Sequence, residues 1–330
     1  MSPYQYNCTD DSILLSFLKN NFFSLLHRGI PYGVPANYLT LVSIIVIWSC
    51  FFYFIGIETP NNTDIFIAFF AIMIYVIFDH FDGLQAKKTN TGSPLGEILD
   101  HYSDVFNGSL IIYIFFRILQ IELDWIFYLS IWANLTAFTL TYLEQNIKKE
   151  LYFGKLGSLE GLVLIQIIIL SFMTAQGKIF WLGYTINNIQ VHNFLLLGLI
   201  LGVLYTVANS IKRLQQIPKS FIHYVVNGSI LIFLCVFYQI NWYFSFLVIN
   251  VYSADLILKS MNSHLLDAED PKPDLIVYVL YLFLFFQLFF EYELYFCFQV
   301  YGIIVMAKIL WNLFHIFYKL RNYWVWWNLN

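Results

Sequence analysis

The stretch Asp79–Asp104, DHFDGLQAKKTNTGSPLGEILDHYSD, carries two aspartates on either side of a short polar turn. Asp79 and Asp82 are three residues apart and Asp100 and Asp104 are four apart, so each pair shares one face of a helix. Two antiparallel helices joined by this turn would bring the pairs together, where four like charges repel by several kcal/mol. A hard divalent cation bound by oxygen ligands relieves such repulsion. The stretch therefore predicts a Mg²⁺ or Mn²⁺ site with all four aspartates as ligands.

Small residues lie one helical turn from the aspartates, at Gly83, Ala86 and Gly96. A glycine inside a helix costs about 1 kcal/mol relative to alanine, which is understandable if a bulky ligand approaches the backbone beside the metal. Close packing of two helices through small residues is the alternative. Lys87 follows directly and could neutralise a phosphate, although a loop lysine can equally serve only to orient the chain in a membrane.

The whole sequence has the composition of a membrane protein. Of its 330 residues, 59% are hydrophobic, 20% are aromatic and only 12% are charged, whereas soluble domains carry roughly a quarter charged residues. The net charge of -4 provides no basic surface for nucleic acid. The four cysteines are far apart and form no metal-binding or disulfide pattern, so free and mostly buried thiols are expected.

Ten stretches are apolar enough to cross a membrane as helices, since a span needs about 20 such residues. We predict them at residues 38–57, 65–85, 95–119, 125–144, 159–175, 194–211, 221–240, 242–258, 275–290 and 294–318. Before them, residues 12–27 suit an amphipathic helix, capped by Asp10 or Ser12, that lies in the membrane interface or simply leads into the first span. The predicted fold is an all-α polytopic transmembrane helix bundle of about ten spans with this amino-terminal interfacial helix.

Basic residues indicate how the spans are oriented. Fourteen of the 17 lysines and arginines fall before the first span, in alternate loops or after the last span. Such an excess marks cytoplasmic segments. Both termini and the polar turn around Asn90 are therefore predicted to face the cytosol.

The spacing of the central stretch resembles a known family. It reads Asp79-x2-Asp82-Gly83-x2-Ala86-Lys87-x8-Gly96-x3-Asp100-x3-Asp104, which is similar to the signature of the CDP-alcohol phosphotransferases, except that the family normally has arginine at the position of Lys87. Four further stretches resemble the eukaryotic ethanolaminephosphotransferase and cholinephosphotransferase branch: 4–15 (YQYNCTDDSILL), 35–40 (PANYLT), 93–101 (SPLGEILDH) and 151–161 (LYFGKLGSLEG). The resemblance covers residues 4–181 and is weak beyond them.

This resemblance implies an integral membrane enzyme that transfers phosphoethanolamine or phosphocholine from CDP-ethanolamine or CDP-choline to 1,2-diacylglycerol and releases CMP. Two Mg²⁺ or Mn²⁺ ions would be held by the four aspartates and would bridge the donor diphosphate. The expected substrate-binding residues are Asn37, Gly83, Ala86, Lys87, Asn90 and Gly96, although the two asparagines could also serve only as helix caps.

The resemblance also implies a location in the cell and a division of the chain into parts. The enzyme would lie in the endoplasmic reticulum or Golgi membrane with its active site facing the cytosol. Three parts are expected: an amino-terminal segment (residues 1–34) with the interfacial helix, the catalytic membrane core (35–211) and carboxy-terminal transmembrane helices (212–330). Membrane lipid is a further partner, and a homodimer and the choice between choline and ethanolamine are left open.

The diacylglycerol hydroxyl must lose a proton as it attacks, and the sequence offers two acceptors. Asp104 is the base often proposed across the wider family, but a metal-bound carboxylate is a weak base. His101 has a reference pKa of about 6.5, which suits a base working in the cytosol. We therefore assign the catalytic roles to His101 as base, Glu97 as the residue that orients it, and Asp104 chiefly as a metal ligand. A structural hydrogen bond at the helix start is the alternative for His101.

Three other functions are compatible with parts of the pattern. A CDP-diacylglycerol-dependent phosphatidyltransferase, similar to phosphatidylinositol synthase, would keep the aspartates but reverse the role of the lipid. A non-catalytic membrane scaffold could retain the fold, and Lys87 in place of arginine makes this conceivable. A transporter could use the carboxylates as an ion path, but it leaves the small residues unexplained.

Overall fold

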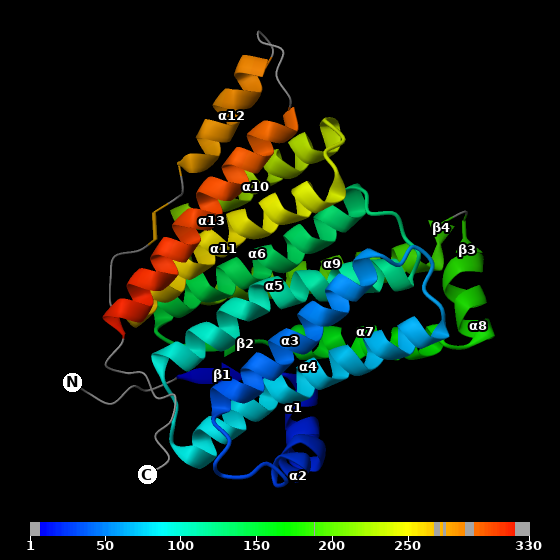
Figure 1. Cartoon of the computed structure of the whole chain (residues 1–330), viewed down its shortest axis with the longest axis vertical. Helices are drawn as coiled ribbons and strands as arrows, with labels where there is room; N and C mark the ends of the chain where they lie inside the picture. Colours follow the sequence, from blue (N-terminus) through cyan, green and yellow to red (C-terminus); the bar gives the residue numbers. More distant parts are fainter. Residues whose placement is uncertain (1–6, 188, 267–270, 273–274, 288–293, 321–330) are drawn as a thin grey trace. The chain divides into compact units, whose positions relative to one another are not determined.

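The computed structural model describes residues 7–187, 189–266, 271–272, 275–287 and 294–320. Helices make up most of this part of the chain (Figure 1). The strands within it form two short pairs, β1 (Cys8–Asp10) with β2 (Leu151–Phe153) and β3 (Thr185–Ile186) with β4 (Ile189–Gln190). The predicted all-α class is confirmed.

Each of the ten predicted spans coincides with a helix. In chain order they are α3 (Ala36–Ile55), α4 (Asn62–Thr89), α5 (Pro94–Ile118), α6 (Trp125–Lys148), α7 (Ser158–Phe172), α9 (Val191–Leu214), α10 (Lys219–Phe237), α11 (Trp242–Leu265), α12 (Ile276–Gln287) and α13 (Leu294–Lys319). Residues 288–290 of the ninth predicted span lie outside the described residues. The sequence pattern therefore located most helix ends to within four residues, and the end of α11 lies seven residues beyond its predicted position.

Fewer of these helices are both long and apolar enough to cross a membrane by themselves. Among the described residues seven meet that condition, and α7 with the bent continuation Ala175–Gly183, which holds α8 (Ala175–Lys178) and the π-helix η2 (Ile179–Gly183), is an eighth candidate. α5 is not among them because polar and charged residues occupy its first half, and α12 is described over only 12 residues. The aspartates thus make α5 less apolar than a helix that crosses the membrane surrounded only by lipid.

The described chain forms two compact units, and the first contains the aspartates. This unit holds the described residues up to Glu122 together with Tyr152–Thr206, which comprise α3, α4, α5, α7, α8 and most of α9. α3 packs against both α4 and α5, and α4 also packs against α7. Apolar side chains from three of these helices, including Ile47, Ile72 and Ile114, are fully buried. The helices that carry the predicted site are therefore held together within a single unit.

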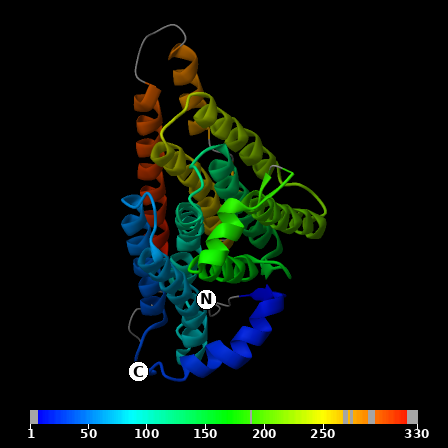
Figure 2. The same cartoon turned by 90° about the vertical axis from the view of Figure 1, so that its right-hand side faces the viewer.

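The amino-terminal segment of the first unit is helical over the predicted residues. It consists of α1 (Ile13–Leu18), a five-residue π-helix η1 (Lys19–Phe23) and α2 (Ser24–His27). Ser12 caps α1 as expected, because its Oγ accepts a hydrogen bond from the Leu15 amide at 3.1 Å. Figure 2 shows this segment (blue) as a bent helical arm, and its ends contact α7 and α4.

The helical arm is amphipathic, as predicted. Phe23 and His27 are buried, whereas Ile13, Phe17 and Leu25 expose about 60% of their surface. Such an apolar outer face suits a helix at a membrane interface.

The second unit holds α6 and the helices from α10 onward, covering Leu123–Leu151 and the described residues from Val207. α11 packs against α6, α10 and α13. The carboxylate of the buried Asp255 pairs with Lys259 at 2.9 Å and with Lys308 at 3.3 Å. Charges within apolar helices are usually paired in this way, and the Lys308 contact joins α11 to α13.

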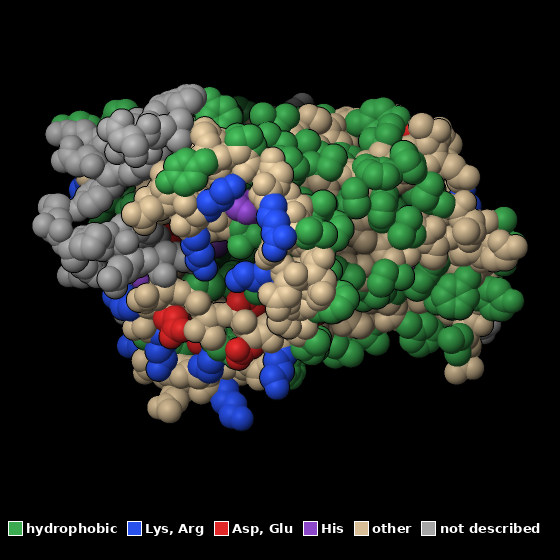
Figure 3. All heavy atoms as spheres, turned by 90° about the horizontal axis from the view of Figure 1, so that it is seen from below, with side chains coloured by type: hydrophobic (Ala, Val, Ile, Leu, Met, Phe, Trp, Pro, Cys, Tyr) green, Lys and Arg blue, Asp and Glu red, His purple; other side chains and the backbone are tan. Residues whose placement is uncertain are grey.

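The surface agrees with the composition. Hydrophobic side chains cover a broad part of the face seen in Figure 3, as expected for helices that face lipid. The four cysteines form no disulfide and three of them are buried, which confirms the prediction for the thiols.

Candidate active site

The polar turn between α4 and α5 is built by residues suited to ending one helix and starting the next. Asn90 ends α4 in the left-handed conformation with a φ of 54°, which asparagine tolerates better than most residues. Ser93 caps α5 by accepting a hydrogen bond from the Gly96 amide at 3.1 Å, and Pro94 occupies the first helical position. The short turn returns the chain alongside α4.

The four aspartates converge as the sequence predicted. Asp100 on α5 is close enough to interact electrostatically with Asp79, Asp82 and Asp104. Asp82 on α4 likewise interacts with Asp104. The two pairs therefore form one acidic cluster, which we call the aspartate cluster.

A histidine lies beside the first aspartate of each pair. The His101 Nδ1 is 3.4 Å from Asp100 Oδ2, and the side chains of these two residues are 12% and 23% exposed. The His80 Nδ1 is 3.7 Å from Asp79 Oδ2, but it donates a hydrogen bond to the Val76 carbonyl at 2.8 Å. The His80 ring is therefore held mainly by its own helix, whereas the His101 ring faces the cluster.

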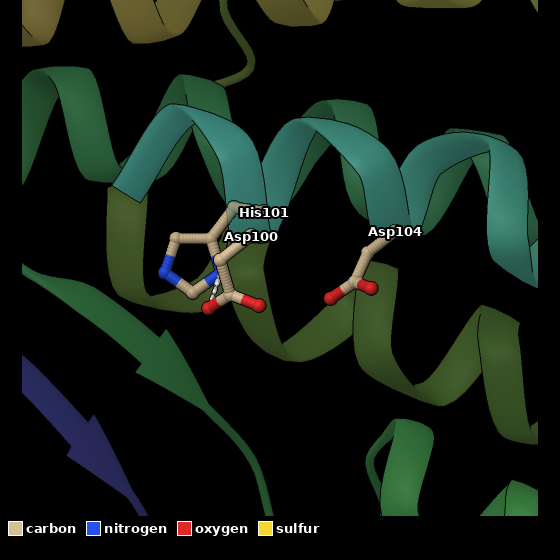
Figure 4. Close-up of side chains that lie close together, drawn as sticks. All are labelled: Asp100, His101 and Asp104. Carbon is tan, nitrogen blue, oxygen red and sulfur yellow. Dashed lines mark ion pairs between the residues drawn. The ribbon is translucent and has the colours of Figure 1, made fainter. Parts of the chain in front are cut away.

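The cluster can accommodate a divalent cation. Figure 4 shows the carboxylates of Asp100 and Asp104 projecting from the same side of α5, with the His101 ring next to Asp100. One potential ligand atom from each of these residues lies within 4.8 Å of the others. The Asp100 Oδ1 is buried and has no hydrogen-bond partner among the described residues. A buried carboxylate oxygen without a donor is costly, and a bound cation would satisfy it.

Two hydroxyl groups donate to the cluster, and Tyr75 is the one that the sequence did not suggest. The Thr40 Oγ1 on α3 donates to Asp82 Oδ2 at 2.6 Å, and the Tyr75 hydroxyl on α4 donates to Asp104 Oδ1 at 2.7 Å. Both donors are buried. A signal for Tyr75 was available, because it lies four residues before Asp79 and so shares the face of α4 that carries it.

The predicted partner of His101 is well placed. Glu97 lies one turn before His101 on α5, is buried, and interacts electrostatically with the imidazole. The structure therefore brings together Glu97, His101 and Asp100 on consecutive turns of one helix.

The remaining predicted residues divide into close-packed and open positions. A Cβ at Gly96 would lie 3.1 Å from Asn37 Oδ1, so this glycine allows the buried Asn37 to approach α5. Gly83 has open space around it, since no described heavy atom lies within 4 Å of the position of a Cβ. Lys87 and Asn90 are exposed at the end of α4, and Ala86 is partly exposed. The ligand interpretation thus suits Gly83, whereas helix packing accounts for Gly96.

Gln85 is a buried residue that sequence reasoning missed. Its Nε2 donates to the carbonyls of Pro31 and Val34 at 3.0 and 2.6 Å, and its Oε1 lies 2.9 Å from the His27 Nε2. Burial lowers the pKa of His27, so a neutral ring donates to the Gln85 oxygen near pH 7. Gln85 therefore fixes the loop before α3 and the end of the helical arm beside the aspartate-bearing turn of α4.

Comparison with known proteins agrees with the resemblance seen in the sequence. Residues 34–189 match the family model described as CDP-alcohol phosphatidyltransferase. An uncharacterized CDP-alcohol phosphatidyltransferase class-I family protein of Schizosaccharomyces pombe is 28% identical over 64% of this chain and 61% of its own length. Choline/ethanolaminephosphotransferase 1 of Saccharomyces cerevisiae is 26% identical over 56% of this chain and 49% of its own length.

A mammalian relative matches at a similar level. Cholinephosphotransferase 1 of Rattus norvegicus is 25% identical over 70% of this chain and 56% of its own length. The chain thus spans about half to three-fifths of the length of these curated relatives.

Proposed function

We propose that the protein transfers phosphoethanolamine or phosphocholine from CDP-ethanolamine or CDP-choline to 1,2-diacylglycerol, because residues 34–189 match the family model described as CDP-alcohol phosphatidyltransferase. The products are CMP and phosphatidylethanolamine or phosphatidylcholine. The observation that carries the proposal is the aspartate cluster, in which four carboxylates from two helices of this domain lie close together. The names of the yeast and rat relatives support the choice of donors.

Asp79, Asp82, Asp100 and Asp104 hold two Mg²⁺ or Mn²⁺ ions in this proposal. Bound there, the ions offset the charge of the donor diphosphate and of the leaving CMP. The unpartnered Asp100 Oδ1 supports this assignment. Lys87, at the exposed end of α4, adds positive charge for the phosphates, and Asn37 and Asn90 are proposed to contact the nucleotide. The open space beside Gly83 and the small side chain of Ala86 admit the donor, and Gly96 keeps Asn37 close to α5.

His101 accepts the proton of the attacking hydroxyl. The diacylglycerol oxygen forms a bond to the phosphorus that carries ethanolamine or choline, and the bond from this phosphorus to the bridging oxygen of CMP breaks. The hydroxyl proton passes to the imidazole of His101, whose orientation is supported by Glu97. Asp104 acts as a metal ligand and not as the base. One of its oxygens already accepts a hydrogen bond from the Tyr75 hydroxyl.

The proposal includes a place in the cell and a division of the chain. The apolar helices are those of an integral membrane protein. We place the protein in the endoplasmic reticulum or Golgi membrane with the aspartate cluster on the cytosolic side, and we assign residues 35–211 to the catalytic core between the amino-terminal segment 1–34 and the carboxy-terminal helices 212–330.

The test offers purified protein three donors. CDP-ethanolamine, CDP-choline and CDP-diacylglycerol, each radiolabelled, are supplied with Mg²⁺ and with diacylglycerol, inositol or glycerol phosphate as acceptors, and the lipid products are separated. We expect phosphatidylethanolamine or phosphatidylcholine together with equimolar CMP. Phosphatidylinositol or phosphatidylglycerolphosphate as the product would assign the chain to the CDP-diacylglycerol-dependent enzymes instead. No product from any donor, with folded protein, would favour the scaffold.

A further inference from the structure

One carboxylate in each aspartate pair is held by a hydroxyl group from another part of the fold. Thr40 of α3 donates to Asp82, and Tyr75 of α4 donates to Asp104. The second contact crosses from the helix that carries one pair to the helix that carries the other. Tyr75 is therefore placed to control how Asp104 on α5 faces the carboxylates of α4.

The geometry of this contact indicates a strong hydrogen bond. The Tyr75 hydroxyl is 2.7 Å from Asp104 Oδ1, a distance typical of a hydroxyl that donates to an ionised acceptor. Tyr75 is only 5% exposed, so water cannot readily replace either partner. A buried tyrosine hydroxyl usually requires such a partner, and here the partner is a member of the aspartate cluster.

This contact has a consequence for the chemistry of Asp104. The hydrogen bond from the Tyr75 hydroxyl restrains rotation of the Asp104 carboxylate. A carboxylate held in one orientation is a better metal ligand than one that rotates freely.

We propose that Tyr75 is a positioning residue that holds the Asp104 carboxylate in the orientation in which it would bind the metal. The proposal rests on the proposed function, since it assumes that the aspartate cluster binds divalent cations. Groups that orient metal ligands typically change metal affinity by 10- to 100-fold when they are removed. Tyr75 would act in this way without touching the substrate.

The test measures Mn²⁺ binding to the purified full chain by electron paramagnetic resonance, without any donor or acceptor. Tyr75→Phe removes only the hydroxyl oxygen and keeps the buried ring. We expect the dissociation constant for Mn²⁺ to rise by about 10- to 100-fold and the spectrum of the bound ion to change. Tyr75→His, which can retain a donor at a shorter reach, should fall between the wild type and Tyr75→Phe.

Tyr53→Phe is the matched control. The Tyr53 hydroxyl donates to Asp64 Oδ1 at 2.6 Å, so this variant also breaks a hydrogen bond from tyrosine to aspartate. Asp64 lies in the first turn of α4, more than four turns before Asp82. Mn²⁺ binding by Tyr53→Phe should equal that of the wild type.

The outcomes separate this inference from the proposed function. Wild-type Mn²⁺ affinity and spectrum in both Tyr75 variants would overturn the role of Tyr75, whatever reaction the protein catalyses. A wild-type chain that binds no Mn²⁺ would overturn it too, because there would be no ligand to position. Weakened binding in Tyr75→Phe together with a product other than phosphatidylethanolamine or phosphatidylcholine would support the inference while refuting the proposed substrates.

Discussion

The carboxylates of Asp82 and Asp100 differ in their hydrogen bonds. Asp82 accepts a hydrogen bond from Thr40, whereas Asp100 has one buried oxygen without a partner among the described residues. Replacing either carboxylate with an amide removes a negative charge and little volume. The variants Asp82→Asn and Asp100→Asn therefore test charge without leaving a cavity.

We expect each asparagine variant to lose transfer activity by roughly 100-fold or more, because a metal ligand is lost. The lipid product is measured at saturating donor, and thermal unfolding is followed alongside to show that the helices remain assembled. Glu122→Gln is the control, since Glu122 is an exposed carboxylate beyond the end of α5. A variant of the cluster that keeps full activity would remove that aspartate from the proposed metal site.

Substitutions at His101 and at Asp104 are expected to impair different parts of the reaction. His101→Ala should lose about 10² to 10⁴ in kcat, the usual contribution of a general base, while it still binds the donor. Asp104→Asn should weaken Mn²⁺ and donor binding together. Donor binding is followed by calorimetry, and turnover is followed by CMP release.

His80→Ala is the comparison for His101→Ala. The His80 ring also lies beside an aspartate, but its Nδ1 is hydrogen-bonded to the Val76 carbonyl. We therefore expect His80→Ala to lower kcat by less than about tenfold. Near-normal turnover in His101→Ala, combined with an Asp104→Asn variant that binds metal normally yet is inactive, would reverse the two roles.

The convergence of the aspartates could be predicted from the sequence, because four aspartates spaced three and four apart around a polar turn can converge in few ways. Tyr75 and Gln85 were missed. Tyr75 shares a helix face with Asp79, but a tyrosine or glutamine in a helix is compatible with many surroundings. Gly96 was interpreted as room for a ligand, but its role depends on the approach of Asn37 from another helix, which spacing along the chain cannot reveal.

Among the elements, the start of the helical arm is joined to α7 through one carboxylate. Glu160 Oε1 accepts hydrogen bonds from Ser12 Oγ at 2.6 Å and from the Leu14 amide at 3.1 Å, while its Oε2 accepts one from the Gly157 amide at 2.8 Å. Glu160 thus caps the start of α7 and anchors the start of α1.

Glu160→Ala should release the start of the arm. Loss of a helix cap typically costs about 1 kcal/mol, and here the caps of two helices are lost together. We expect amide hydrogen exchange over residues 12–18 to become faster, while exchange in α4 and α5 stays unchanged. Ser12→Ala removes one of these hydrogen bonds and the Ser12 cap of α1, so exchange over residues 12–18 should also become faster, while Glu160 still caps the start of α7. Equal exchange in the wild type and both variants would show that the arm is held by other contacts, such as Phe23 against the His80 ring.

The sequence predicted this arm as a single amphipathic helix, and the structure confirms its position. The π-helix at Lys19–Phe23 was not predicted. A π-turn rotates the residues that follow it, and here Phe23 and His27 both face inward toward His80, Phe81 and Gln85. Hydrophobic periodicity assumes 3.6 residues per turn, so it cannot anticipate such an insertion.

For the whole molecule, the distribution of charge predicts the orientation in the membrane. Fourteen of the 17 basic residues fall in segments assigned to the cytosolic side. A cysteine introduced at the exposed Asn90 should therefore react with a membrane-impermeant maleimide applied from the cytosolic side. Cys8 is an exposed cysteine outside any disulfide, so Cys8→Ser provides the necessary background, and a cysteine at Glu122 is the control expected to react only from the opposite side. Labelling of position 90 from the lumenal side would contradict the orientation.

The ten helices could be predicted because each contains a run of apolar residues, but the grouping of helices into units could not. α6 belongs with α10 and α11 in the second unit although it follows α5 directly in the chain. This grouping depends on close contacts between particular residues. The ring of Trp132 on α6 lies so near Gly228 on α10 that it leaves no room for a larger side chain at position 228. Contacts between helices about 90 residues apart leave no trace in local periodicity.

If the aspartate cluster binds divalent cations required for phosphotransfer to diacylglycerol, activity must depend on the metal. Lipid product and CMP are measured from the purified protein in the presence of Mg²⁺, after removal of the metal with EDTA, and after Mg²⁺ is restored in excess. We expect product formation to cease with EDTA, to return with Mg²⁺ or Mn²⁺, and not to be restored in Asp100→Asn. Transfer that continues at its full rate in excess EDTA would show that the cluster does not act through a metal.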